Sequence, residues 1–205
     1  MKEAAVVLFA RAPARGRVKT RLAAMAGVAA ATRAYSALLG LALARAASWP
    51  GPRAIACADE DSRRYFAGLP QAAGFSCFEQ EGADLGARMR AALRWGLAQA
   101  PGAILIGTDV ADHAPGDLFS ARAALAKSDV VLGPVADGGY WLIAVHEDRP
   151  ALFADVPWST PRVFSRTLQH ARGLSVQVLP MRRDVDDAAA LAACPLPWAL
   201  AVPEA

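Results

Sequence analysis

Cysteine and histidine are scarce in this chain, and both are scattered. The three cysteines, Cys57, Cys77 and Cys194, are odd in number and far apart, which excludes a disulfide framework and a cysteine-based zinc site. The three histidines form no pattern with serine or aspartate that would support acyl transfer. No apolar run approaches the ~18 residues of a transmembrane helix, and the first one is too short for a signal peptide. We therefore expect a cytoplasmic protein with no membrane partner.

Two common phosphate-binding loops are also missing. A Walker A loop needs a glycine directly before Lys-Ser/Thr and another glycine five residues earlier. Here Lys19-Thr20 follows Val18, and Pro13 stands at the earlier glycine position. The dinucleotide fingerprint G-x-G-x-x-G does not follow the first apolar run either. A phosphate site in this chain must therefore be built in another way.

The composition is that of a folded protein, and we expect one domain spanning residues 1–205. Hydrophobic residues make up 55% of the 205 positions, which excludes a disordered chain. Expected strands are residues 4–10, 53–58, 74–78, 103–107, 129–135, 140–145 and 175–180. Expected helices are residues 22–47 (broken near Gly27), 59–69, 84–99, 115–127, 161–172 (capped by Thr160) and 188–193. This alternation predicts an α/β fold with a mainly parallel sheet covered by helices on both faces. The Asp-Gly-Gly connection near residue 138 predicts one antiparallel hairpin within that sheet.

A basic stretch, F-A-R-A-P-A-R-G-R-V-K-T-R-L at residues 9–22, connects the first expected strand to the first helix. Five of its fourteen residues are cationic and none is acidic. From residue 4 to residue 58 the chain has eight Lys or Arg and no acid, giving +8, so the remainder carries −5 of the total +3. A strand, a basic glycine-containing loop and a helix start together favour a phosphate site. The alternative is an ordinary solvated surface loop.

Asp109 is the second candidate residue, because it follows the apolar run Ile104-Leu105-Ile106 at the expected carboxyl end of a central strand. Ligands of open α/β sheets gather at that edge, which also carries the basic loop. A carboxylate there can hold Mg²⁺ together with substrate phosphates. The alternative is a turn-forming or helix-capping aspartate.

Three further stretches contain candidate residues. In R-R-D-V-D-D, Asp184 and Asp186 face the same side of an extended segment, so either could supply a second carboxylate, although aspartate before a short helix is also an ordinary cap. Gly138 and Gly139 form a hairpin turn first, and a substrate contact is the minority interpretation. Asp84 can cap the helix that follows it, but the glycines on either side indicate close packing or ligand approach.

These motifs, taken in order, resemble a known family. F-A-R-A-P-A-R-G-R-V-K-T-R-L, D-L-G-A-R-M, G-T-D-V, V-L-G-P-V-A-D-G-G-Y-W-L-I, W-S-T and D-V-D run from residue 9 to residue 186. They are similar to short bacterial GT-A-type glycosyltransferase-like proteins of unknown function. That family resembles 2-phospho-lactate guanylyltransferases and, more remotely, molybdenum-cofactor guanylyltransferases. The resemblance implies a nucleotide-diphospho-sugar transferase (GT-A) fold, a three-layer α/β/α arrangement with a seven-stranded mixed sheet.

The resemblance also implies roles for individual residues. The nucleotide phosphates would contact four residues of the basic loop: Arg11, Gly16, Lys19 and Arg21. Asp109 would take the first metal position and Asp186 the second, with Mg²⁺ or Mn²⁺ as the cofactor. Asp84, Gly138 and Gly139 would belong to the substrate site, the two glycines bordering the acceptor. The chain departs from the family pattern after Asp109, where Val-Ala replaces Cys-Pro. It departs again after Asp186, where the family has Thr and a carboxylate-bearing helix and this chain has Asp187 and three alanines.

The leading interpretation is a Mg²⁺-dependent transferase that uses an activated nucleotide as donor and a small molecule as acceptor. Lys19 and Asp109 would be its catalytic residues. The donor could be a nucleoside triphosphate, in nucleotidyl transfer, or a nucleotide-sugar, in glycosyl transfer. The altered closing motif motivates a rival interpretation, a non-catalytic nucleotide-binding module of the same fold. A nucleic-acid partner is disfavoured, because the chain does not interleave aromatic and basic residues.

Overall fold

The computed structural model describes residues 3–114, 116–194, 196 and 198–205. Its strands, in chain order, are β1 (Ala5–Ala10), β2 (Arg53–Cys57), β3 (Ser76–Glu79), β4 (Ala103–Ile106), β5 (Val130–Pro134), β6 (Tyr140–Val145) and β7 (Val176–Val178). They form one seven-stranded sheet in the order β3-β2-β1-β4-β6-β5-β7. Only β6 runs antiparallel to its neighbours, β4 and β5. The predicted mainly parallel sheet and its single antiparallel hairpin are therefore confirmed.

The α-helices connect the strands and cover both faces of the sheet. They are α1 (Thr20–Ala26), α2 (Val28–Ala47), α3 (Glu60–Gly68), α4 (Leu85–Gln99), α5 (Asp117–Leu125), α6 (Val163–His170) and α7 (Ala188–Ala193). Short 3-10 helices are η1 (Pro70–Ala72), η2 (Pro150–Phe153) and η3 (Trp198–Leu200). The predicted break near Gly27 is confirmed, since this residue has a φ of 86° between α1 and α2.

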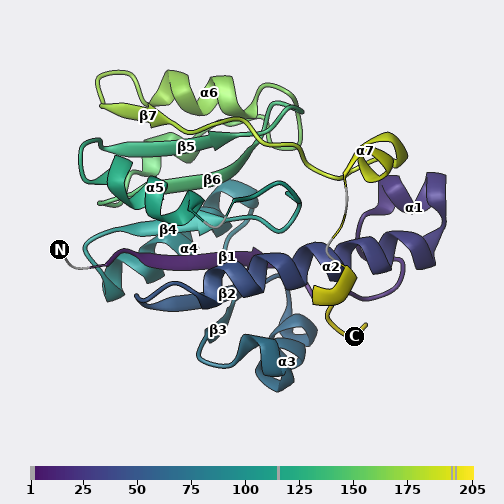
Figure 1. Cartoon of the computed structure of the whole chain (residues 1–205). Helices are drawn as coiled ribbons and strands as arrows, with labels where there is room; N and C mark the ends of the chain where they lie inside the picture. Colours follow the sequence, from purple (N-terminus) through teal and green to yellow (C-terminus); the bar gives the residue numbers. More distant parts are fainter. Residues whose placement is uncertain (1–2, 115, 195, 197) are drawn as a thin grey trace.

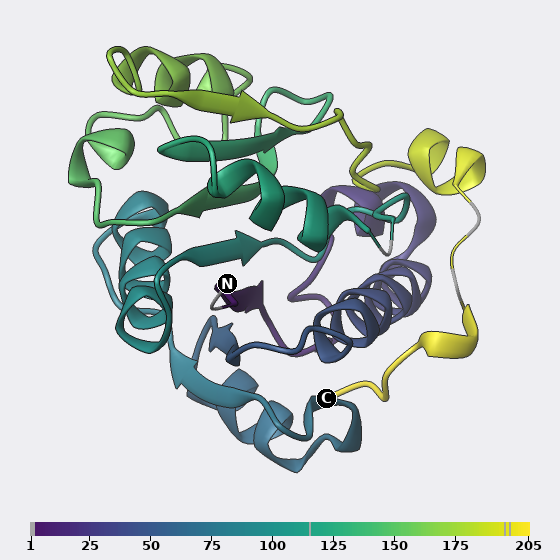
Figure 2. The same ribbon diagram turned by 60° about the vertical axis from the view of Figure 1, so that its left-hand side comes forward.

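Three layers result, and they are visible in Figures 1 and 2, where α2 and α4 lie on opposite sides of the sheet. Strand residues on one face pack with Leu39 and Leu43 of α2, Phe66 of α3 and Leu118 of α5. Residues on the other face pack against the second set of helical elements, which comprises α4, η2 and the end of α6. A nearly continuous apolar run such as β4, buried at every position, is what a strand covered on both faces requires.

A smaller apolar cluster lies beyond the sheet edge. It joins Leu22 of α1, Leu38 of α2 and Val185, which precedes α7. Figure 1 shows α7 beside α1, although the two helices lie at opposite ends of the chain. Among the described residues, no helix combines the length and apolar character that a membrane span requires.

The start of α6 differs from the one predicted. Thr160 does not cap α6: the helix begins at Val163, and its N-terminal position is taken by Arg162 without a side-chain cap. The Thr160 hydroxyl instead donates to the Pro157 carbonyl (2.6 Å) and accepts from the Arg162 N–H (3.3 Å), a local turn that competes with helix initiation. The predicted start of the α5 helix at Pro115 lies outside the described residues.

The contact between α4 and the sheet requires a glycine at position 96, which gives a prediction. A methyl group on Gly96 would lie 2.7 Å from the Ala103 Cβ and 3.4 Å from the Ala5 Cβ. We expect Gly96→Ala to lower the free energy of unfolding by about 1–3 kcal/mol, because a packed core does not accept an extra carbon. Gly68→Ala is the control, since Gly68 ends α3 with open space around it and Ala favours helix by up to about 1 kcal/mol. Urea denaturation measures both, and equal stabilities would contradict the packing argument.

Candidate functional site

The candidate site lies where several strands end. β1, β4, β5 and β7 are parallel, so the residues that follow them reach the same edge of the sheet. The basic loop follows β1, Asp109 follows β4, and the segment containing Asp184 and Asp186 follows β7. β6 is antiparallel and therefore begins at this edge, at Tyr140. Four distant parts of the sequence thus meet at one place.

Lys19 connects three of these parts. Its Nζ lies 2.5 Å from the Asp109 Oδ1 and 2.6 Å from the Asp186 Oδ1, and its side chain is only 4% exposed. Burial alone lowers the pKa of Lys19, but the Asp109 and Asp186 carboxylates together raise it above its ordinary value. The ammonium therefore stays protonated. The backbone of Lys19 has a φ of 47°, a left-handed conformation at the start of α1.

Asp186 also belongs to a group of three carboxylates. One oxygen each from Asp137, Asp184 and Asp186 lies within 4.8 Å of the others. The segment is held against the end of β4, since the Val185 N–H donates to the Asp109 carbonyl at 2.9 Å. Its alternation turns Val185 into the core and both flanking aspartates outward, as predicted. Burial raises the pKa of Asp184, and the nearby Asp137 and Asp186 charges raise it further.

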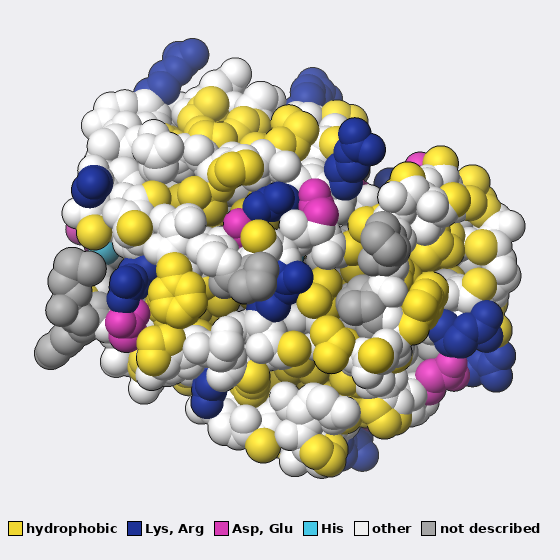
Figure 3. All heavy atoms as spheres, in the orientation of Figure 1, with side chains coloured by type: hydrophobic (Ala, Val, Ile, Leu, Met, Phe, Trp, Pro, Cys, Tyr) yellow, Lys and Arg dark blue, Asp and Glu magenta, His cyan; other side chains and the backbone are white. Residues whose placement is uncertain are grey.

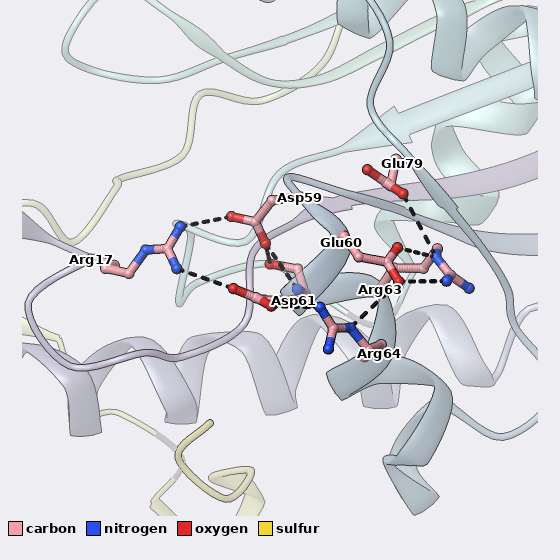
Figure 4. Close-up of polar contacts among 8 residues, drawn as sticks. Arg17, Asp59, Glu60, Asp61, Arg63, Arg64 and Glu79 are labelled. Carbon is pink, nitrogen blue, oxygen red and sulfur yellow. Dashed lines mark hydrogen bonds and ion pairs between the residues drawn. The ribbon is translucent and has the colours of Figure 1, made fainter.

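The basic loop divides into two parts. Lys19 and Arg21 lie beside the carboxylates, Arg21 at the wall of the cavity described below. Arg11 and Arg17 turn to Asp59, with nitrogen–oxygen distances of 3.9 and 3.1 Å. Figure 4 shows Arg17 reaching Asp59 and Asp61 at the start of α3, where Asp59 also accepts the Ser62 N–H at 2.9 Å. Of the four predicted phosphate-binding residues, the structure thus places two near Asp109 and Asp186.

The remaining candidate residues lie in loops, helix caps and the cavity wall. Gly16, with a φ of 75°, lies in the exposed part of the loop. Asp84 caps α4 by accepting the Ala87 N–H at 2.8 Å, and Asp187 caps α7 by accepting the Ala190 N–H at 2.7 Å. Gly138 has a φ of 91° and packs so closely on Pro161 that no side chain fits there. Gly139 lines the cavity beside the carboxylates.

A cavity of about 480 Å³ opens beside the carboxylates. The aromatic residues that line it were not among the site residues predicted from the sequence. Tyr140 begins β6, and burial raises the pKa of its hydroxyl. Trp158 packs on Gly86 of α4, where any side chain would clash with the indole ring. The wall also includes four carboxylates (Asp109, Asp137, Asp184 and Asp186) and three apolar side chains (Leu85, Met89 and Val163).

A second, wider groove adjoins the same carboxylates. It has a volume of about 1080 Å³ and passes α1 at Met25 and α7 at Ala190. Four residues line both spaces: Arg21, Asp137, Asp184 and Asp186. The charged residues are therefore reachable from two sides. In the sequence, Asp137 could be recognised only as part of a hairpin turn, and the Asp137 Oδ1 does accept the Gly139 N–H at 2.9 Å. Its position beside Asp184 and Asp186 was therefore not predicted.

Comparison with known proteins assigns the family. Residues 41–160 match the model of DUF2064, an uncharacterized protein conserved in bacteria. The chain belongs to this family. Among curated proteins, none matches the chain.

Solved structures show the same fold. A crystal structure from Desulfovibrio desulfuricans, provisionally named a nucleotide-diphospho-sugar transferase, is 29% identical with a TM-score of 0.84 and covers 91% of this chain and 84% of its own. CMP:2-keto-3-deoxy-manno-octonic acid synthetase complexed with CTP is 14% identical with a TM-score of 0.59, covering 93% and 96%. Rv0371c of Mycobacterium tuberculosis in complex with manganese is 20% identical with a TM-score of 0.57, covering 94% and 97%. The DUF2064 chain therefore has the nucleotide-diphospho-sugar transferase fold, which confirms the resemblance inferred from its motifs.

The attachment of the basic loop to α3 yields a prediction about Asp59. We expect Asp59→Ala to lower the free energy of unfolding by about 1–2 kcal/mol, because α3 loses its N-cap and Arg17 loses a partner. Asp61→Ala removes an exposed carboxylate that also pairs with Arg17 but is no cap, so its effect should stay within about 0.5 kcal/mol. Thermal denaturation compares the two variants.

The effect of Asp59→Ala on the free energy of unfolding should also depend on pH. Partial burial acts to raise the pKa of Asp59, but the hydrogen bonds from Ser62 and the two arginines together lower it in the folded chain. A lowered folded pKa stabilises the protein above the unfolded pKa, and that contribution disappears as the pH falls through the folded value. The stability difference between wild type and Asp59→Ala should therefore shrink in acid. A difference independent of pH would show that the carboxylate charge has no part in it.

Proposed function

We propose that this DUF2064 protein is a Mg²⁺-dependent transferase whose donor is an activated nucleotide, a nucleoside triphosphate or a nucleotide-sugar. The observation that carries the proposal is the protonated Lys19 ammonium held between Asp109 and Asp186 at the strand ends, with Arg21 nearby. The likeness to a provisionally named nucleotide-diphospho-sugar transferase supports the same class of reaction.

The carboxylate oxygens around Lys19 are suitable ligands for a magnesium ion. Asp109 and Asp186 already direct one oxygen each at a single cation, Lys19, and the neighbouring group contains Asp137 and Asp184. Mg²⁺ prefers such oxygen ligands and needs only one or two carboxylates beside substrate phosphates. Asp109 and Asp186 would hold it, and the bound ion would supply charge neutralisation at the reacting phosphate. The manganese complex of the fold relative Rv0371c is consistent with this choice of cation.

Lys19 and Arg21 would bind the phosphates of the donor. A lysine ammonium has three N–H donors, and two of them point to Asp109 and Asp186, which leaves one for a phosphate oxygen. Arg21 is exposed and can turn toward either space beside the carboxylates. These cations would also stabilise negative charge that develops on the leaving phosphate group.

The acceptor would occupy the 480 Å³ cavity. Lys19 and Arg21 of the basic loop lie beside the carboxylates that line this cavity, so a donor bound by the loop and an acceptor in the cavity would meet at Asp109. In nucleotidyl transfer, an acceptor oxygen forms a bond to the α-phosphorus and the bond from that phosphorus to its bridging oxygen breaks. Pyrophosphate leaves with the electron pair, and the acceptor proton passes to a nearby carboxylate such as Asp137.

Small-molecule substrates also agree with one face of the molecule. On the face shown in Figure 3, Lys and Arg side chains are scattered among hydrophobic and acidic ones and form no continuous basic area. A nucleic-acid partner would need such an area to contact a run of phosphates. We therefore propose a small-molecule acceptor.

Turnover with a panel of donors tests the proposal. Purified protein, Mg²⁺, each nucleoside triphosphate or nucleotide-sugar and a pool of candidate acceptors are incubated, and products are analysed by mass spectrometry. Release of pyrophosphate identifies nucleotidyl transfer, and release of a nucleoside diphosphate identifies glycosyl transfer. Binding of nucleotides without turnover of any donor across the panel would instead support the non-catalytic module.

Lys19 gives a prediction that does not need the acceptor. Lys19→Met should weaken nucleotide binding by about 1.5–3 kcal/mol, the contribution of a charged hydrogen bond, as measured by calorimetry. The same variant should bind Mn²⁺ alone at least as well as wild type, because the ammonium no longer competes for Asp109 and Asp186. Arg15→Met is the control, since it removes a cation of the same loop that pairs with Glu204 instead. An equal loss in both variants would point to a general charge effect.

Two adjacent aspartates separate metal binding from helix capping. Asp186→Asn should abolish the Mn²⁺-dependent rise in melting temperature, because a ligand oxygen of the proposed site loses its charge. Asp187→Asn should keep that rise, since asparagine is as good an N-cap as aspartate and α7 remains capped. A differential thermal-shift assay with and without Mn²⁺ measures both. Loss of the response in Asp187→Asn alone would refute the assignment of Asp186.

A further inference from the structure

The 480 Å³ cavity has two chemically different ends. Carboxylates form one end, where Asp137 and Asp184 extend the group that begins at Lys19. Apolar and aromatic side chains form the other, at α4, where Tyr140 contacts Met89 and Trp158 packs on Gly86. A ligand that fills the cavity must therefore present a polar group to the carboxylates and a flat apolar group to the aromatic residues.

The aromatic end is held in place by the chain itself. Trp158 lies flush on Gly86, a position where any larger residue would displace the indole. The segment that contains Trp158 is fixed to the β5–β6 hairpin, because the Phe164 N–H donates to the Gly138 carbonyl at 2.8 Å. The Tyr140 hydroxyl oxygen lies 3.9 Å from the sulfur of Met89, which belongs to α4. A wall fixed in this way can select its ligand by shape.

The charge of the lining is strongly one-sided. Among the described residues that line the cavity there are four carboxylates, at positions 109, 137, 184 and 186, and one cation, Arg21. In the proposed function, Arg21 and the remaining Lys19 N–H bind the donor phosphates, so neither is left for the acceptor. A divalent cation bound by Asp109 and Asp186 would arrive with donor phosphates that restore the negative charge. A phosphate or carboxylate on the acceptor would therefore find no free partner in this cavity.

We propose that the acceptor is a hydroxyl compound that carries a flat apolar group and has no negatively charged group. This inference rests on the proposed function, which assigns the cavity to the acceptor. Repulsion by Asp137 and Asp184 excludes anionic acceptors, and stacking on Trp158 selects flat ones. The same carboxylates accept hydrogen bonds from a hydroxyl or an amine at the polar end of the ligand.

Three small phenols of nearly equal size test the charge preference: tyrosol, which is neutral, tyramine, which is cationic, and 4-hydroxyphenylacetate, which is anionic. Dissociation constants are measured by ligand-observed NMR at neutral pH, without nucleotide or metal. We expect tyrosol and tyramine to bind at least about tenfold more tightly than 4-hydroxyphenylacetate, the size of effect that a nearby like charge produces. Equal or tighter binding of 4-hydroxyphenylacetate, or binding of none of the three at millimolar concentration, would overturn the proposal.

Substitutions of cavity residues test whether the probes bind in this cavity. Asp184→Asn should reduce the discrimination against 4-hydroxyphenylacetate severalfold, whereas Glu147→Gln, which removes an exposed carboxylate outside the cavity, should leave it unchanged. Trp158→Leu should weaken tyrosol binding at least severalfold, with circular dichroism as the check on folding. Unchanged binding in a folded Trp158→Leu protein, or equal effects of Asp184→Asn and Glu147→Gln, would place the probes elsewhere and refute the inference.

A competition experiment separates this inference from the proposed function. Nucleoside triphosphate and Mg²⁺ are added to the tyrosol complex, and their own binding is measured in parallel. Retention of tyrosol beside a bound nucleotide supports an acceptor site, whereas displacement would assign the cavity to the nucleobase and overturn the proposal. If the probes show the expected preference but no nucleotide binds, the proposed transferase function fails while the ligand class of the cavity stands.

Discussion

One buried ammonium holds the site together. Lys19 is almost fully removed from water, and a lysine there costs free energy unless the charge is compensated. Asp109 and Asp186 provide that compensation while remaining 54% and 40% exposed, so only the lysine is desolvated fully. The three groups together carry one negative charge. This arrangement joins the end of β1, the end of β4 and the segment after β7, and it leaves the carboxylates accessible to a second cation.

The same short segment serves the core and the site. Val185 is 1% exposed and packs with Leu22 and Leu38, while Asp184 and Asp186 on either side of it face the solvent. Burial of one apolar side chain therefore sets the direction of two carboxylates. The Val185 N–H also donates to the Asp109 carbonyl, so the register of this segment is tied to the residue that follows β4. A change in core packing near Leu22 would consequently move the proposed metal ligands.

The positions of Asp109 and of the two aspartates around Val185 could be predicted from local sequence patterns. The apolar run before Asp109 and the alternation around Val185 depend on local patterns, and both positions follow from them. The pairing of Arg11 and Arg17 with Asp59 could not be predicted in the same way. It arises because β1 and β2 are neighbours in register, with Ala10 opposite Cys57, so the residues after each strand meet. Strand order is a property of the whole sheet, and the local charge excess of the basic loop contains no information about it.

The antiparallel strand β6 is what turns a strand-end site into a cavity. In an all-parallel sheet, the strand after β5 would begin at the opposite edge, after a crossover connection. Because β6 runs the other way, a tight hairpin returns the chain at the same edge and delivers Asp137, Gly139 and Tyr140 beside Asp109. Gly138 is required at the tip of that hairpin, since it packs against Pro161 and so brings Trp158 with it. The aromatic wall therefore follows from the sheet topology, and Gly138, which the sequence alone explains as a turn former, is the residue that lets the Trp158 segment pack on the hairpin.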